Sequence, residues 1–211
     1  MPYPSRTDRT AIVAAAIAVL DERGLDDVSL RAIAAHLGIR QPALYHHFAS
    51  KADLLDAVAE DVLAQRHTER LPHDGERWDA FVIRNARSMR QAMLSIRDGA
   101  RLIASAGSRS PHLDTAIAQV GLLENAGFTP ADAILALIAV SRYTIGSAIE
   151  QQTARDGGDI VIDTDRTDEE TTHFLESTRH VVALGQDYEF EAGLGALIRG
   201  LVPTTFAPAP E

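Results

Sequence analysis

The segment from Ser29 to Lys51 constrains the fold of this 211-residue chain more than any other. Its first half carries apolar residues on one helical face, namely Ile33, Ala34 and Leu37. Gly38 then predicts a left-handed helix end, and Gln41 and Pro42 open a second short helix where a missing N–H costs nothing. Two helices joined by so short a turn predict a helix-turn-helix, a motif that can read DNA.

The charge of the chain is divided unevenly. The net charge is −10, yet residues 1–51 hold six Arg or Lys side chains against five acids, which leaves −11 on the remaining 160 residues. An acidic body on a near-neutral head would touch DNA with the head alone, because the body repels phosphate. Acidic surfaces also keep proteins soluble, so this division supports the motif without proving it.

Composition excludes several classes of protein. The chain has no cysteine, which excludes disulfides and thiolate metal sites. No apolar run approaches the roughly 18 residues that span a bilayer, and the N-terminal segment lacks an apolar signal core. We therefore expect a cytoplasmic protein with no membrane partner.

Almost the whole chain has helical periodicity, which predicts an all-α fold. A first helix from about Thr7 to Arg23 would brace the motif, and a connecting helix would start at the capping box of residues 50–53. Further helices are expected at about 78–95, 99–106, 113–125, 131–152, 168–184 and 188–202, with a loop at 155–167. The predicted parts are a three-helix DNA-binding head at 1–51, a connecting helix at 52–70, a larger ligand-binding and dimerisation body at 71–202, and a disordered tail at 203–211.

The last helix carries more apolar residues than one core needs, namely Phe190, Leu194, Leu197, Ile198 and Leu201. Together with the long apolar helix at 131–152, it predicts a two-fold dimer interface that resembles a four-helix bundle. A homodimer would also hold two heads about 34–36 Å apart, the spacing of successive major grooves on one face of DNA.

These features together resemble the TetR family of transcriptional regulators, and within it the tetracycline-repressor subgroup. The resemblance runs from about Arg9 to Leu201, through the helix-turn-helix and the body segments LLDAVAEDVLAQRH, RDGA, VSRYTIGSAIEQQ and LIRGL. It implies a repressor that binds a palindromic double-stranded DNA operator as a homodimer and is released by a small-molecule effector. The sequence does not distinguish repression from activation.

The resemblance assigns DNA contacts to nine residues of the head: Ser29, Arg31, Gln41, Pro42, Ala43, Tyr45, His46, His47 and Lys51. It gives base contacts to Arg31 and Gln41, whose side chains can pair bidentately with guanine and adenine. It gives a phosphate contact to Lys51, the only lysine in the chain. Alternatively, Arg31 only caps its helix and Tyr45 only packs.

The resemblance also implies a ligand pocket made by His67, Asn85, Met89, Ile103, Ala106, Gln119 and Glu150. His67, Asn85 and Gln119 stand where tetracycline repressors grip the polar edge of the drug. Those repressors bind the drug as a magnesium chelate, and Ile103 replaces their direct histidine ligand to the metal. Because Mg²⁺ requires oxygen ligands or water in octahedral geometry, we expect neither a metal site nor a cofactor here.

Two interpretations of the pocket stay open. In the first, a drier pocket takes a polycyclic, polar-edged molecule without obligatory magnesium. In the second, the polar residues serve the structure, for example with Asn85 bonded to backbone and Glu150 paired with Arg142, and the ligand is unrelated or absent. The sequence lacks the Gly-x-Ser-x-Gly, His-Glu-x-x-His and phosphate-loop motifs of common enzymes, so we do not expect catalysis.

Overall fold

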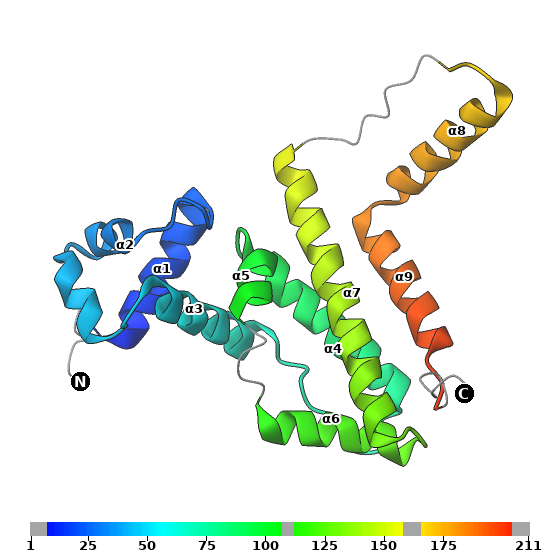
Figure 1. The fold of residues 1–211 in the computed structure, drawn as a ribbon, viewed down its shortest axis with the longest axis horizontal. Coiled ribbons are helices and arrows are strands. Elements are labelled where there is room, and N and C mark those ends of the chain that lie inside the picture. The colour runs from blue at the N-terminus through cyan, green and yellow to red at the C-terminus, as the bar shows by residue number, and fades with distance from the viewer. Residues whose placement is uncertain (1–7, 107–111, 158–165, 204–211) are drawn as a thin grey trace, which may run out of the picture.

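The computed structural model describes residues 8–106, 112–157 and 166–203, and within these ranges the secondary structure is entirely helical. The helices are α1 (Arg9–Arg23), α2 (Leu30–Leu37), the 3₁₀ helix η1 (Gln41–His46), α3 (Lys51–Arg66), α4 (Trp78–Leu94), α5 (Gly99–Ala106), α6 (Leu113–Asn125), α7 (Pro130–Gly157), α8 (Glu169–Leu184) and α9 (Gln186–Gly200). The prediction of an all-α fold is confirmed. Figure 1 shows the head of α1 and α2 at one end and the body of α4 to α9 at the other, with α3 between them.

Local signals in the head act as the sequence predicts. The Oγ atom of Ser29 accepts a hydrogen bond of 3.2 Å from the Ala32 N–H at the start of α2, and Gly38 ends α2 in the left-handed region with φ of 68°. The second helix of the motif is a 3₁₀ helix with Pro42 in its first turn. It spans six residues, which is longer than the three or four that are usual for this tighter geometry.

Helix α3 joins the head to the body. It starts at Lys51, where the Ser50 hydroxyl accepts a hydrogen bond of 3.1 Å from the Asp53 N–H, as the capping box predicts. It ends at Arg66, four residues before the predicted end, because the backbone turns away at His67 with φ of −98° and ψ of 78°. The α3 helix packs against α1, α4 and α5, so it contacts both parts of the molecule.

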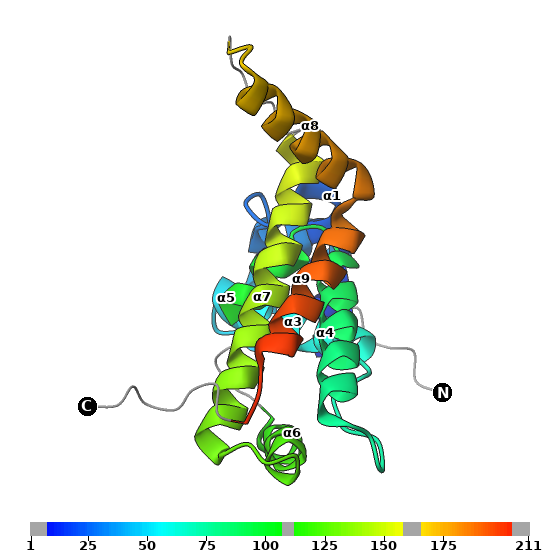
Figure 2. The ribbon, with the colours of Figure 1, turned by 90° about the vertical axis from the view of Figure 1, so that its right-hand side faces the viewer.

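One apolar core runs through this junction. It joins head residues such as Leu20 and Leu44 to body residues such as Met93 and Leu102, all with no exposed surface. A second core lies deeper in the body, where α4, α7 and α9 run side by side (Figure 2), and Phe81, Leu123 and Phe190 are buried in it. The head is therefore not an independent unit, and a shift at the α3–α4 contact changes the support of the motif.

The structure corrects the predicted use of the last helix. The apolar residues that we assigned to a dimer interface belong to the second core of a single chain, with exposed fractions of 8% or less for Phe190, Leu194, Ile198 and Leu201, and Leu197 packs against that core. Apolar residues at helical spacing form one apolar face of a helix, and in α9 this face packs against α4 and α7 of the same chain.

Three other predictions have mixed outcomes. Helix α7 continues to Gly157, so it includes the first residues of the predicted loop at 155–167, and residues 158–165 lie outside the described ranges. The predicted tail lies outside them too, apart from Pro203. Residues 130–154 of α7 are long and apolar enough to cross a membrane by length and composition, and a third of their most apolar stretch is buried. Core helices of folded domains have the same length and composition, and α7 packs against α4, α5, α6 and α9.

Candidate nucleic-acid interface and ligand cavity

The motif presents most of the predicted DNA-contacting side chains at the surface. Its apolar anchors, Leu44 and Phe48, are 0% and 3% exposed. Four predicted contact residues are exposed, namely Arg31, Pro42, Tyr45 and His46, and four are half-buried, namely Gln41, Ala43, His47 and Lys51. These eight side chains lie between the first turn of α2 and the first residue of α3, and their DNA contacts stay predictions.

Contacts within the head explain how this surface is held. The Arg9 guanidinium donates a hydrogen bond of 3.2 Å to the His47 carbonyl and lies 4.3 Å from the centre of the Phe48 ring. Cation–π and hydrogen-bond contacts of this kind fix the end of η1 against α1. Ser29 is engaged as the α2 cap, which gives it a structural role beside the predicted DNA contact.

A cavity of about 330 Å³ lies in the body beside the end of α3. Five of the seven predicted ligand residues line it, namely His67, Asn85, Met89, Ala106 and Gln119. Ile103 lies outside the lining, 2% exposed in the neighbouring core, and Glu150 lies outside it on an exposed face of α7. The suggested pairing of Glu150 with Arg142 is not among the ion pairs of the described residues.

The rest of the lining was not named from the sequence. It comprises Asp56, Ala59, Glu60, Leu63, Arg70, Val82, Ala86, His112, Thr115, Ala116, Leu137, Val140, Ser141 and Thr144. Helical spacing relative to His67 and Asn85 could have found Leu63 and Val82. No spacing rule could have found Arg70, because it lies in an irregular turn.

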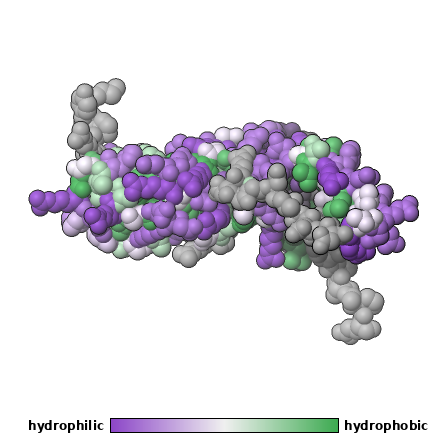
Figure 3. Space-filling view, turned by 90° about the horizontal axis from the view of Figure 1, so that it is seen from above, coloured by the Kyte–Doolittle hydropathy of each residue, from purple (hydrophilic) through white to green (hydrophobic). Residues whose placement is uncertain are grey.

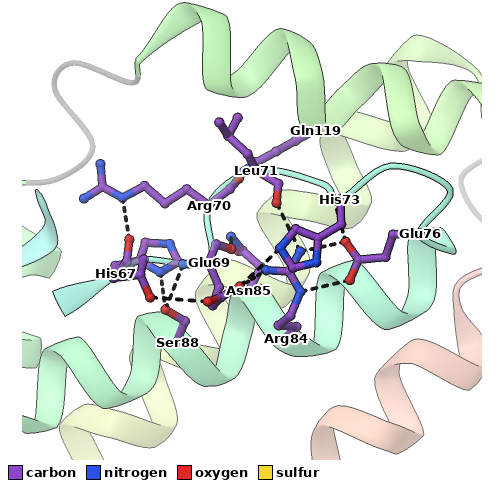
Figure 4. Close-up of polar contacts among 11 residues, drawn as sticks. His67, Glu69, Arg70, Leu71, His73, Glu76, Arg84, Asn85, Ser88 and Gln119 are labelled. Atoms are coloured by element: carbon purple, nitrogen blue, oxygen red, sulfur yellow. Dashed lines mark hydrogen bonds and ion pairs between the residues drawn. The ribbon is translucent and has the colours of Figure 1, made fainter. Parts of the chain in front are cut away.

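Polar side chains hold this turn, residues 67–71, against α4 and α6 (Figure 4). The Asn85 amide donates to the Glu69 carbonyl over 2.9 Å, and the Gln119 amide donates to the Arg70 carbonyl over 2.8 Å. The Nδ1 atom of His67 lies 2.9 Å from the Ser88 hydroxyl. Two of the predicted ligand residues therefore already bond backbone, while within the described ranges their amide oxygens accept no hydrogen bond and can serve a ligand.

His67 is neutral at physiological pH. Burial of the ring is the main cause that lowers its pKa to about 4, the positive charge of Arg70 adds to this, and Glu69 opposes it. The side chain is 9% exposed. A neutral imidazole in the lining can donate or accept a hydrogen bond without repelling a cationic ligand.

Arg84 fastens the far side of the same turn. It donates to the Leu71 carbonyl over 3.0 Å, pairs with Glu76 at 2.6 Å and also pairs with Glu69. The hydrogen bond from Arg84 is the main cause that lowers the pKa of Glu76 to about 2. Side chains of α4 therefore bond the turn at its start, at His67, and at its end, at Leu71. The position of the turn depends on α4.

A second set of contacts joins the body to the head. The Asp98 carboxylate accepts a hydrogen bond of 2.7 Å from the Leu25 N–H, and the Asp21 carboxylate accepts one of 2.8 Å from the Arg97 N–H. Arg101 pairs with Asp26 at 2.9 Å. These bonds place the start of α5 directly against the end of α1.

A helix-turn-helix head on a helical body with an internal cavity defines a class, the helical transcriptional regulators with a DNA-binding and a ligand-binding part. The family described as "Bacterial regulatory proteins, tetR family" matches residues 12–58, and "Tetracyclin repressor-like, C-terminal domain" matches residues 71–204. The chain belongs to the TetR family, as the sequence resemblance predicted.

Individual relatives agree with this assignment. The tetracycline repressor protein class G of Vibrio anguillarum is 41% identical over 198 residues, which cover 93% of this chain and 94% of that protein. The crystal structure of TetR from Acinetobacter baumannii AYE matches with a TM-score of 0.78 and 40% identity over 92% of this chain and 95% of that one. A TetR variant from the same bacterium in complex with minocycline matches with a TM-score of 0.80 and 36% identity over 97% of each chain.

Proposed function

We propose that this regulator is a repressor that binds a palindromic operator as a homodimer and leaves it when a small molecule fills the 330 Å³ cavity. One observation carries the proposal: α3 starts at Lys51 beside the motif, and the cavity residue His67 follows directly after its last residue. A ligand that moves the end of this helix would move its start as well. The protein would act in the cytoplasm, where its operator lies, and not as an enzyme.

The proposed effector is a polycyclic molecule with a polar edge, bound without obligatory magnesium. The size of the cavity suits a small ligand, since ligand pockets span roughly 300–1,000 Å³. Its wall combines apolar side chains such as Met89 and Val140 with His67, Asn85 and Gln119. Ile103 offers a metal no oxygen, and Glu150 lies on an exposed face outside the lining.

A second candidate is a DNA-binding regulator with an unrelated ligand or none. It is favoured by the hydrogen bonds from Asn85 and Gln119 to the carbonyls of Glu69 and Arg70. Those bonds give both amides a structural role that needs no ligand.

Exposed apolar side chains support the homodimer. They lie on α7 (Ile134, Leu135, Ile138), on α8 (Phe174, Val181, Val182, Leu184) and on α9 (Tyr188). No described residue of α8 is buried, and α8 extends beyond the ends of α7 and α9 (Figures 1 and 2). Figure 3 shows apolar patches within the hydrophilic surface at the α8 end. A second copy would cover such patches, and sedimentation of a monomer at micromolar concentration would contradict this part of the proposal.

The proposed mechanism is a population shift between two spacings of the paired heads. A ligand that contacts His67 would tilt α3, and the hydrogen bonds that join Asp98 to Leu25 and Arg97 to Asp21 would carry the movement of α5 to the end of α1. The two η1 segments would then no longer match successive major grooves.

The test is a thermal-shift titration with tetracycline, with magnesium and with a chelator, together with release of a duplex selected from random sequences. A ligand at 100 times its dissociation constant stabilises the fold by about 2.7 kcal/mol. We expect a shift and DNA release that both survive the chelator. The variant His67→Ala should bind the duplex normally but release it less. A shift that needs magnesium would overturn the metal-free proposal, and no shift would favour the second candidate.

A further inference from the structure

The Arg70 side chain lies in the cavity wall with an unused hydrogen-bond donor. Its Nε atom donates to the His67 carbonyl over 3.0 Å, and the side chain reaches back from the turn over His67 (Figure 4). Its Nη2 atom is buried and has no hydrogen-bond partner in the part of the chain that the structure describes. A buried donor on a charged group costs more than about 1–3 kcal/mol when it is unpaired, so a ligand acceptor that reaches this atom would recover that cost.

The surroundings of Arg70 do not neutralise it. No acid of the described residues forms an ion pair with it, since Glu69 turns to Arg84 and His73. Burial lowers the pKa of Arg70 from its usual value, which leaves the side chain charged at neutral pH. His67 is neutral beside it, so Arg70 is a positively charged side chain in a lining that also holds two carboxylates, Asp56 and Glu60, and apolar groups such as Met89 and Val140.

We propose that Arg70 anchors an anionic oxygen group of the effector, such as a carboxylate or an enolate, and thereby selects acidic polycyclic ligands over their neutral analogues. This inference rests on the proposed ligand-binding function of the cavity. The guanidinium presents planar N–H donors that match two oxygens of one group. Charge-assisted hydrogen bonds of this kind are stronger than hydrogen bonds between neutral groups. The free amide oxygens of Asn85 and Gln119 would accept from hydroxyl or N–H groups on the same ligand.

The test compares two probes of nearly equal shape, anthraquinone-2-carboxylate and anthraquinone-2-carboxamide. Isothermal titration on the full chain should show the carboxylate binding tighter by about 10-fold to 100-fold. Arg70→Met keeps the apolar stem and Arg70→Gln keeps a donor for the His67 carbonyl, and both should remove this preference. Arg23→Met is the matched control, because Arg23 is exposed at the end of α1 and should leave the preference unchanged.

The outcomes separate this inference from the proposed function. Equal binding of the two probes by wild type, binding of neither, or a preference that survives in both Arg70 variants would overturn the anchor. The thermal midpoint of each variant without probe shows that it folds. Arg70→Met removes an unpaired buried donor but also the hydrogen bond to the His67 carbonyl, so we expect little net change in its midpoint. Tetracycline-induced DNA release by wild type, measured in parallel, tests the proposed function whatever the probes do.

Discussion

The Nδ1 atom of His67 lies 2.9 Å from the Oγ atom of Ser88, and the same hydroxyl accepts a longer hydrogen bond of 3.4 Å from the Glu69 N–H. This pair fixes the point at which α3 ends and the turn crosses α4. Burial of the imidazole, together with the positive charge of Arg70, outweighs the nearby Glu69 carboxylate, and the pKa of His67 is therefore lowered.

The first prediction concerns pH. The pKa of His67 is lowered to about 4 from 6.5, so between these values the unfolded chain binds the proton and the folded chain does not. Stability from this residue is therefore complete above about pH 6.5 and is lost as pH falls toward 4. From about pH 7 to about pH 5 the free energy of unfolding should fall by about 2 kcal/mol from this group alone.

Urea denaturation at several pH values measures this dependence. His67→Gln, which cannot titrate, should show a shallower decrease than wild type. His36→Gln removes an exposed histidine of α2 and should keep the wild-type slope. Identical slopes for wild type and His67→Gln would show that His67 is not the linked group.

The second prediction concerns the two amides that bond the turn. Asn85→Ala and Gln119→Ala each remove a donor to a backbone carbonyl and should each lower the free energy of unfolding by about 1 kcal/mol without any ligand. Asn125→Ala, at the exposed end of α6, should change it by less than about 0.5 kcal/mol. Unchanged stability in the first two variants would mean that these bonds do not hold the turn.

The sequence predicts the regular parts of this molecule better than its turns. Gly38 and the cap at Ser50 are local signals, and the structure has both where the sequence places them. The end of α3 could not be predicted, because Arg66 to Arg70 suit a helix and tertiary contacts, such as those of His67 and Glu69 with Ser88, hold the chain out of it. Helix termini depend on such tertiary contacts.

The cavity illustrates the same limit. His67, Asn85 and Gln119 were named through the family resemblance, and the structure brings them together. The resemblance also named Ile103 and Glu150, which the structure places outside the lining. A family resemblance identifies equivalent positions in the sequence, but it does not say how the side chains around them pack in this chain. The assignment of Phe190 and Leu194 to a dimer interface was wrong for a related reason: spacing identifies an apolar face but not the partner that covers it.

The third prediction concerns DNA. Lys51 begins α3 directly after the motif, so Lys51→Ala should weaken binding to all duplexes alike and reduce the slope of log affinity against log salt by about 0.9. Fluorescence anisotropy at four salt concentrations measures the slope. Arg179→Ala removes an exposed cation on α8, far along the chain from the motif, and should leave the slope unchanged. Parallel lines for Lys51→Ala and wild type would exclude a phosphate contact.

The fourth prediction concerns the contact between head and body. Gly24 ends α1 with φ of 81° and ψ of 167°, and a Cβ atom there would lie 3.0 Å from Asp98 Oδ2 and 3.2 Å from Arg97 Nε. Gly24→Ala should therefore combine backbone strain of about 1–3 kcal/mol with displacement of the carboxylate that bonds the Leu25 N–H. The head should lose part of its support from α5.

Gly185→Ala is a close control for this change. Gly185 has nearly the same backbone conformation, φ of 83° and ψ of 158°, but a Cβ atom there meets nothing within 4 Å. Both variants should lose stability in urea, and Gly24→Ala should lose about 1 kcal/mol more because a hydrogen bond between the two parts is disturbed. Gly24→Ala should also weaken the effect of ligand on DNA binding, since one of the bonds between the start of α5 and the end of α1 is disturbed. Equal losses in the two variants and an unchanged response to ligand would assign the coupling to α3 alone.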